Sequence, residues 1–183
     1  MPQPNSGWTL EMVHALPDDG NRYELIDGEL FVTPAPTVLH QSASLLLSAL
    51  LNAFTRTRGL KTVCAPVAVR LPGGGEVQPD LLVFERPSHS PLPATLDIAQ
   101  LVLAVEILSP STERTDRHAK RHLYQQAGVA EYWIIDLAAR VIERWRPNDV
   151  TPEVVSEVLA WSPREDGEVL RIDVRAYIDS AYD

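Results

Sequence analysis

Residues 101–108 read Leu-Val-Leu-Ala-Val-Glu-Ile-Leu, an almost continuous apolar run. A strand without polar alternation is usually central in its sheet and covered on both faces, so this run predicts the middle strand of the fold. Residues 109–112, Ser-Pro-Ser-Thr, end the strand and open a helix that we expect to reach about Ala127, with Gly128 as its stop. The other predicted elements are described relative to this strand and helix.

Helices and strands alternate on both sides of this strand and helix. Before it, the pattern predicts a short helix over 9–16, a hairpin over 22–33, a long helix over 38–58, and strands over 61–71 and 77–84. After it, the pattern predicts strands over 131–137 and 139–145, then short strands and a final helical turn. The order predicts an α/β fold with a mixed β-sheet flanked by helices.

Length and composition place the chain among ordinary globular proteins. Its 183 residues suit one domain, so we expect 1–183 to fold as a single unit. Hydrophobic residues make up 45% and charged residues 22%, which argues against wholesale disorder. The single cysteine, Cys64, excludes an internal disulfide and fits a reducing compartment. We expect its side chain to be buried as a small hydrophobe.

Charge and apolar runs bear on location and partners. No apolar run approaches the roughly 18 residues of a membrane span. Residues 1–7 lack the basic start and apolar core of a signal peptide, so we expect a cytoplasmic protein without membrane contact. The net charge of −9 argues against strong nonspecific binding to nucleic acid, which Lys and Arg drive by releasing counterions. It still allows an enzyme that meets nucleic acid through one local patch and bridging metal ions.

Two carboxylates lie in or beside apolar strands. Glu106 lies within the run 101–108, where an unpartnered ionised carboxylate costs several kcal/mol, so pairing or metal binding is expected. Asp80 follows Pro79 and precedes the apolar run 81–84. Taken singly, Glu106 could reach a nearby Arg and Asp80 could end a turn. Together, on neighbouring strands, they would hold a hard cation such as Mg²⁺, which takes one or two carboxylates.

Lys120 lies on the helix that follows the Glu106 strand. A helical wheel gives the stripe that packs on the sheet as Asp116, Ala119, Leu123 and Ala127. Lys120 lies at the edge of this stripe, where its amine could stabilise phosphate charge or orient a water. The ordinary alternative is an Asp116–Lys120 pair on a partly solvated face.

Three stretches of the chain carry a family pattern. They are residues 23–30 (Tyr-Glu-Leu-Ile-Asp-Gly-Glu-Leu), residues 78–83 (Gln-Pro-Asp-Leu-Leu-Val), and residues 105–136, from Val-Glu-Ile-Leu-Ser-Pro-Ser-Thr through Asp116, Lys120 and Tyr124 to Glu131-Tyr132-Trp133 and Asp136. The pattern resembles the PD-(D/E)XK nuclease superfamily, which has the restriction-endonuclease-like fold. Within that superfamily it resembles the Uma-two family of restriction endonucleases, with a family-like core over about 20–146.

The resemblance implies Mg²⁺-dependent hydrolysis of DNA, with Mn²⁺ as an alternative ion and with Asp80 and Glu106 as the metal ligands. The superfamily's lysine stands two residues after the acid, where this chain has Leu108. The resemblance suggests that the lysine has moved to Lys120. Glu24 completes the catalytic set as the N-terminal acid expected to line the site, and a solvated strand acid is its alternative.

Other candidates are weaker. His40 and Gln41 begin the long helix and could line the cleft, but a surface position is the ordinary interpretation. His118 and His122 are four apart, as in zinc helices, but no motif supplies a third ligand, so we interpret them as surface residues. A basic cluster follows the central strand, and some of it could contact phosphates. It consists of Arg114, Arg117, Lys120, Arg121 and His122.

The sequence leaves alternatives open. A catalytically inactive module for binding nucleic acid or protein is one, and an enzyme for RNA or branched DNA is another. We also expect a homodimer, because cutting both strands of a duplex most simply needs two sites related by a two-fold axis. Trp145, Trp161 and the strands after Tyr132 are candidate contacts, although the same residues could close the domain's own core.

The proposed site makes geometric and electrostatic predictions. Asp80 and Glu106 should lie on adjacent strands and on one face of the sheet, with Lys120 pointing into the same cleft. In the metal-free protein at least one of the two acids should have a raised pKa, opposed by Lys120.

Overall fold

The computed structural model describes residues 7–86, 91–164 and 167–183. Residues 1–6, on which most of the signal-peptide argument rests, lie outside this range. Six strands of the described chain form a mixed sheet in the order β11-β10-β9-β8-β6-β3. They are β3 (Leu60–Cys64), β6 (Leu81–Glu85), β8 (Leu101–Ile107), β9 (Glu131–Asp136), β10 (Val141–Trp145) and β11 (Glu153–Val155). The β8 strand pairs parallel with β9 and antiparallel with β6, so the apolar run is interior to the sheet, as predicted.

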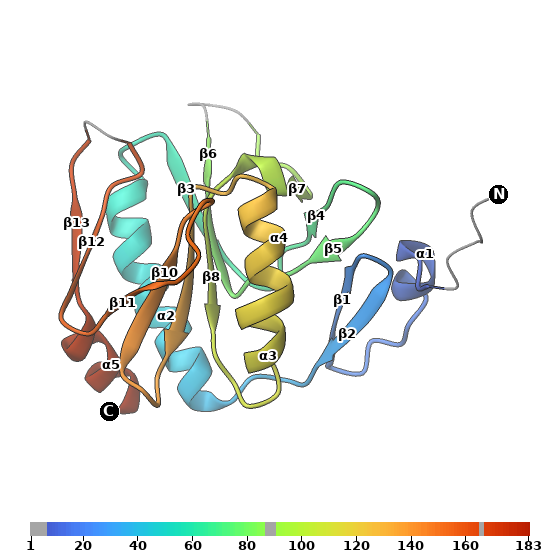
Figure 1. The fold of residues 1–183 in the computed structure, drawn as a ribbon, viewed down its shortest axis with the longest axis horizontal. Helices are drawn as coiled ribbons and strands as arrows, with labels where there is room; N and C mark the ends of the chain where they lie inside the picture. Colours follow the sequence, from blue (N-terminus) through green and yellow to red (C-terminus); the bar gives the residue numbers. More distant parts are fainter. Residues whose placement is uncertain (1–6, 87–90, 165–166) are drawn as a thin grey trace.

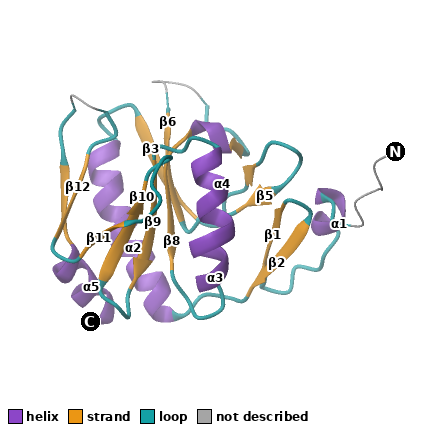
Figure 2. Cartoon of the chain, in the orientation of Figure 1, coloured by secondary structure: helices purple, strands orange, loops and turns teal. Residues whose placement is uncertain are grey.

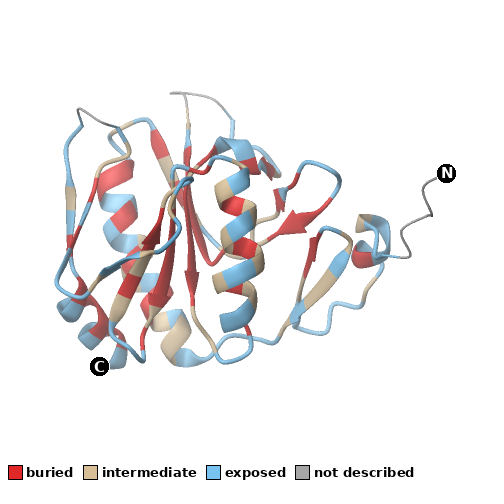
Figure 3. Cartoon of the chain, in the orientation of Figure 1, coloured by how far each residue is buried: buried red, intermediate tan, exposed pale blue. Residues whose placement is uncertain are grey.

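Helices cover both faces of this sheet, α4 in front and α2 behind in the view of Figure 2. The α2 helix spans Val38–Thr55, and α5 spans Val174–Tyr182. The front helix is continuous from α3 (Glu113–Thr115) through a π-helical turn (Asp116–Lys120) to α4 (Arg121–Gln126). Val83 and Val105 point to the α2 side, whereas Leu82 and Ala104 point to the α4 side. Both faces are therefore apolar, which is why the inner strands β6, β8 and β9 are mostly buried in Figure 3.

A second sheet lies beside the first and carries the N-terminal hairpin (Figure 1). Five short strands of the described chain form it in the order β2-β1-β5-β4-β7. They are β1 (Arg22–Ile26), β2 (Glu29–Thr33), β4 (Val69–Arg70), β5 (Glu76–Val77) and β7 (Leu96–Asp97). The hairpin turns at Asp27 and Gly28, with φ of 51° and 81°, as the Asp-Gly pair predicts.

Short elements complete the described chain. Helix α1 spans Leu10–His14 and is capped by Thr9, whose hydroxyl accepts from the Met12 amide. A 3₁₀ turn at Ile98–Gln100 leads into β8. The β12 (Val158–Trp161) and β13 (Leu170–Asp173) strands form a separate hairpin.

Two predicted strands are each divided in the structure. The chain over 61–71 forms β3 and then β4, and the chain over 77–84 forms the end of β5 and then β6. Pro66 and Pro79 lie at the breaks, and proline has no amide to donate to a strand ladder. The chain therefore leaves the central sheet after β3, enters the second sheet, and returns at β6, directly after Asp80.

Cys64 is exposed, which corrects the expectation that it is buried. It is the last residue of β3, which is an edge strand of the central sheet. An edge strand is covered on fewer sides than a central one, so an apolar-looking stretch there need not be buried.

The tryptophans expected at a dimer contact pack inside the chain instead. Trp161 is 1% and Trp145 7% exposed, and Trp161 packs edge-on against the buried Trp133. Their burial removes these two residues as contacts, whereas Val154 on β11 and Val158 on β12 are exposed. The homodimer itself stays a prediction.

One described helix, α2, is long and apolar enough to cross a membrane, with 18 residues and a mean hydropathy of 1.2. This differs from the expectation that no segment reaches that length. Length and composition alone are weak evidence, and Leu47 and Leu51 of this helix are buried against the central sheet. The packing of the domain therefore accounts for the apolar face of α2.

Candidate active site

The pairing of β6 with β8 places Asp80 next to Glu106. Leu81 pairs with Val105 in an antiparallel register, so the preceding residue, Asp80, lies opposite Glu106. The Ile107 amide donates to Asp80 Oδ2 over 2.8 Å, which holds the carboxylate against the central strand. Asp80 is 4% and Glu106 0% exposed. The two acids thus lie on neighbouring strands, as the strand pattern predicts.

Lys120 reaches Glu106 from the front helix. Its Nζ atom lies 2.9 Å from Glu106 Oε1, and the side chain is 1% exposed. The helical wheel placed Lys120 at the edge of the packed stripe, whereas the structure places it at the centre. The reason is the π-helical turn over 116–120, because its wider turn brings residues four apart into line, so that Asp116, Lys120 and Tyr124 face the sheet together.

Glu24 completes the contacts of Lys120. Its Oε2 atom lies 2.9 Å from Lys120 Nζ, and its Oε1 atom accepts from the Gln78 amide over 2.7 Å. Glu24 is 1% exposed, so the alternative of a solvated strand acid is wrong. It links the N-terminal hairpin to the front helix, and the Gln78 contact ties it to the segment that delivers Asp80.

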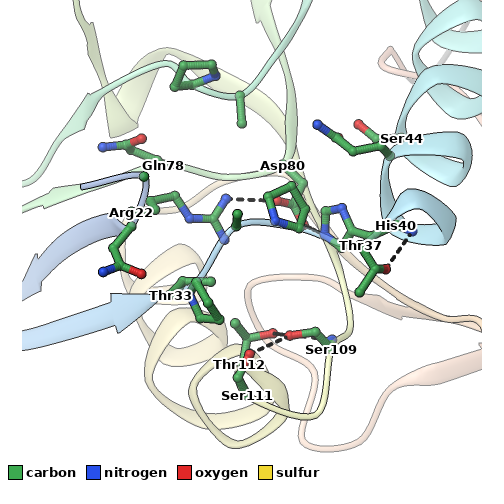
Figure 4. Close-up of a pocket in the computed structure, with 18 of the residues that line it drawn as sticks. Arg22, Thr33, Thr37, His40, Ser44, Gln78, Asp80, Ser109, Ser111 and Thr112 are labelled. Carbon is green, nitrogen blue, oxygen red and sulfur yellow. Dashed lines mark hydrogen bonds and ion pairs between the residues drawn. The ribbon is translucent and has the colours of Figure 1, made fainter. Parts of the chain in front are cut away.

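Arg22 and His40 also contact Asp80, and no sequence motif marks either residue strongly (Figure 4). The Arg22 guanidinium donates to Asp80 Oδ1 over 2.8 Å, and His40 Nε2 lies 3.0 Å from Asp80 Oδ2. Because an ionised carboxylate only accepts, Nε2 carries the proton in this contact. Arg22 reads as an ordinary strand residue. The surface interpretation of His40 is wrong, since α2 begins beside the cleft and directs this side chain inward.

The cluster contains more buried acid than cation. Within the described chain four carboxylates, those of Glu24, Asp80, Glu106 and Asp116, face two permanent cations, Arg22 and Lys120. Two carboxylates are therefore left without a cation of their own. Glu106 Oε2 and both oxygens of Asp116 have no hydrogen-bond partner among the described residues, although Asp116 Oδ1 lies 3.6 Å from Lys120 Nζ.

This imbalance separates the pKa values of the acids. Burial raises the pKa of Glu106 well above its ordinary value, and the charge of Lys120 opposes the rise. Burial likewise raises the pKa of Asp116, again opposed by Lys120. Burial would also raise the pKa of Asp80, but the His40 hydrogen bond and the Arg22 charge lower it well below its usual range. One acid of the pair is thus raised, with burial rather than mutual repulsion as its largest cause.

A carboxyl-detected NMR titration of the metal-free protein tests this assignment. We expect the Glu106 carboxyl to titrate above 4.5, its ordinary value, while Asp80 stays ionised to lower pH than 3.8. The reason is that Glu106 is desolvated with one free oxygen, whereas Asp80 is held by Arg22 and His40. Ordinary values for both acids would mean that the cluster is open to solvent.

The surplus of carboxylate suits a bound cation. Among the described residues no group of three or more His, Cys, Asp and Glu side chains is arranged to hold a metal ion. Mg²⁺, however, usually keeps several waters and takes only one or two carboxylates from protein. The cross-strand pair of Asp80 and Glu106 offers two carboxylates, and Glu106 Oε2 has no partner among the described residues.

A cavity of about 870 Å³ opens in front of Asp80. Its walls come from the segment before β1, the β2–α2 connection, the end of β3 and the loop after β8 (Figure 4). Asp80, Arg22 and His40 line it, whereas the lining does not include Glu106, Glu24 or Lys120. The cluster therefore has two layers, an accessible one around Asp80 and a buried one around Lys120. The prediction that Lys120 points into the cleft is wrong, because its amine is turned to the buried Glu24 and Glu106.

The other candidates lie outside this cluster. His118 and His122 are exposed on the front helix, as expected for surface residues. The basic cluster is not one phosphate-binding face, because Lys120 is buried and Arg117 pairs with Asp136 and Glu143. Arg121 stacks over the Trp145 ring, 4.7 Å from its centroid.

Comparison with solved structures identifies the class of fold. The chain superposes with a TM-score of 0.80 on a crystal structure described as a "putative nuclease belonging to DUF820" from Anabaena variabilis ATCC 29413. The match covers 95% of this chain and 99% of that chain at 20% sequence identity. The fold is therefore restriction-endonuclease-like, with mixed sheets flanked by helices, as the sequence pattern predicts.

The sequence places the chain within this class. The profile of the Uma2 family, described as "Putative restriction endonuclease", matches residues 10–175, and the chain belongs to that family. The resemblance found in the sequence motifs is confirmed. None of the curated proteins matches the chain.

Proposed function

We propose that the chain is a Mg²⁺-dependent endonuclease that hydrolyses phosphodiester bonds of DNA. One observation carries the proposal. Asp80 lines the cavity and lies opposite the buried Glu106 of the neighbouring strand, and Lys120 is bonded to Glu106. Membership of the Uma2 family supports a nuclease of this kind. A bound Mg²⁺ would lower the pKa of a water and neutralise charge on the scissile phosphate.

The residues of the site have different roles in this proposal. Asp80 and Glu106 would hold the ion, since they supply the oxygen ligands that it prefers. Arg22 and His40 fix the orientation of Asp80 through one bond to each carboxylate oxygen. Glu24 holds Lys120, Lys120 in turn holds Glu106, and the Lys120 charge keeps Glu106 closer to its ionised form. Because the lining of the cavity does not include Lys120, its role is to position and charge-balance Glu106 rather than to touch the substrate.

The contact between Lys120 and Glu106 bears on the inactive-module alternative. That alternative gained weight from Leu108, which stands where the superfamily has its lysine. The structure brings a different lysine to the same acid, with Nζ 2.9 Å from Glu106 Oε1. The charge that Leu108 lacks is thus restored from the front helix, and this favours the enzyme over the module.

Cleavage and metal binding, measured side by side, test the proposal. Plasmid and oligonucleotide DNA should be cut with Mg²⁺ or Mn²⁺ and should stay intact with EDTA. Calorimetric titration with Mn²⁺ should show binding to the wild-type protein. DNA that stays intact with either ion, while Mn²⁺ fails to bind, would contradict the proposal.

Replacing His40 by glutamine should lower the cleavage rate about 10- to 100-fold, because groups that orient a metal ligand carry an effect of that size. The change should leave the fold intact, since His40 is only partly buried. His118→Gln on the exposed face of the front helix is the matched control and should keep the wild-type rate. Equal rates for the two variants would remove His40 from the site.

The homodimer and the cytoplasmic location also belong to this proposal. Two sites related by a two-fold axis would allow both strands of a duplex to be cut. Sedimentation equilibrium at micromolar concentration decides the assembly, and a particle with the mass of a single chain would exclude the dimer.

A further inference from the structure

The lining of the cavity carries few positive charges. Among the described residues Arg22 is the one lysine or arginine in the lining, and it is bonded to Asp80. Asp18 and Glu76 add further negative charge to the lining. The remaining polar groups are mainly hydroxyls and amides. They include Asn21, Thr37, Gln41, Gln78, Ser109 and Ser111.

This lining does not suit the backbone of a duplex. A protein that holds duplex DNA neutralises several phosphates with Lys and Arg, and released counterions supply much of its affinity. The chain carries a net charge of −9, and three members of the basic cluster on the front helix, Arg117, Lys120 and Arg121, make internal contacts. Hydroxyls and amides also bond phosphate oxygens, but they release no counterions.

The depth of the site gives a second, independent argument. Asp80 is 4% exposed, and Glu106 lies behind it at 0%. A phosphate must therefore enter the cavity to reach them. The cavity of about 870 Å³ has the size of a small-ligand pocket, which ranges from roughly 300 to 1,000 Å³. A duplex is far wider, since its major groove alone is about 12 Å across.

The walls of the cavity match the two chemistries of an unpaired nucleotide. On the loop after β8, the Ser109 hydroxyl lies 3.0 Å from the hydroxyls of Ser111 and Thr112, and this group faces the Arg22–Asp80 pair in Figure 4. Pro36 and Pro66 add apolar surface to the lining, against which the face of a base can pack. A strand taken out of its duplex presents both its phosphates and its base faces.

We propose that this cavity takes one or two unpaired nucleotides, so that the substrate is single-stranded or locally unpaired DNA bound mainly by hydroxyls and amides. This inference rests on the proposed nuclease function and narrows its substrate. The strand enters between the β2–α2 connection and the loop after β8, and its phosphate meets Asp80. Because few counterions are released, binding changes little with salt.

Cleavage of one sequence in three forms tests the inference. The forms are a single strand, a blunt duplex, and a duplex with a central unpaired bubble, each with Mg²⁺ at about 50 and 200 mM salt. The single strand and the bubble should be cut at least about tenfold faster than the blunt duplex. Their rates should fall less than about tenfold between the two salt concentrations, whereas six to ten phosphate contacts would cost about 10³–10⁵ in affinity.

A bulky side chain at the rim of the cavity tests the substrate inference separately from the proposed nuclease activity. Ser111 is exposed on the rim, so Ser111→Trp should fold normally. The variant should cut the single strand about tenfold or more slowly than the wild type. Fluorescence anisotropy of a labelled strand should show binding weakened by a similar factor. Ser156→Trp, exposed and outside the cavity lining, is the control and should keep the wild-type rate. If the blunt duplex is cut as fast as the single strand, the inference about the substrate is wrong but the proposed nuclease activity stands. If no form is cut with Mg²⁺ or Mn²⁺, the proposed nuclease activity itself is wrong.

Discussion

Replacing Asp80 by asparagine should reduce the rate of metal-dependent cleavage by at least about 100-fold. Removing a group that merely orients a metal ligand lowers activity about 10- to 100-fold, and Asp80 would itself be a ligand. Asparagine keeps the shape of the side chain but removes the charge that would bind Mg²⁺ and that Arg22 and His40 contact. Calorimetric titration with Mn²⁺ should show weaker binding in the same variant. Cleavage rates on one oligonucleotide, with and without EDTA, give the measurement.

The control for this variant lies on β6, the strand that Asp80 directly precedes. Glu85→Gln changes an exposed acid at the opposite end of β6 and should keep the wild-type cleavage rate. The Asp80 variant also leaves Arg22 without its closest partner, so thermal unfolding of each variant must show that it is folded at the assay temperature. A folded Asp80→Asn protein that cuts at the wild-type rate would remove Asp80 from the site.

Replacing Lys120 by methionine should lower the free energy of unfolding by about 3–5 kcal/mol at neutral pH, the cost of breaking a buried ion pair by removing one partner. Glu24 and Glu106 would each lose a cation at 2.9 Å, in a cluster that already holds surplus acid. Denaturant unfolding measures the change. The chain's other lysine, Lys61, is only partly buried, and Lys61→Met should cost less than about 1 kcal/mol.

The pH dependence of this loss has a definite sign. Burial raises the pKa values of Glu106 and Asp116 in the folded protein, and without Lys120 they rise further. Between their ordinary values of 4.5 and 3.8 and the raised ones, the folded state binds more protons than the unfolded state. Stability therefore increases as the pH falls through that window. The deficit of Lys120→Met should be largest at neutral pH and should shrink toward pH ~5. A deficit independent of pH would mean that lost packing, not lost charge, causes it.

The local pattern of the sequence determined the frame of this protein. The apolar run 101–108 predicted a covered strand, the Asp27-Gly28 pair predicted the hairpin, and Thr112 and Gly128 bounded the front helix. Each of these features depends on residues that are neighbours in the sequence, so a short sequence pattern is enough to predict it. The placement of Asp80 and Glu106 on neighbouring strands also followed from their positions beside apolar runs.

The tertiary structure decided which side chains meet. Arg22 and His40 contact Asp80 from 58 and 40 positions away, and neither stands in a local pattern that marks it. The π-helical turn moved Lys120 from the edge of the stripe to its centre, because an α-helical wheel assumes a constant turn. Cys64 was misplaced because its burial depends on whether another strand pairs beyond β3. Contacts of this kind depend on the strand order and on what packs over each strand, and these are set by the whole chain rather than by any stretch of it.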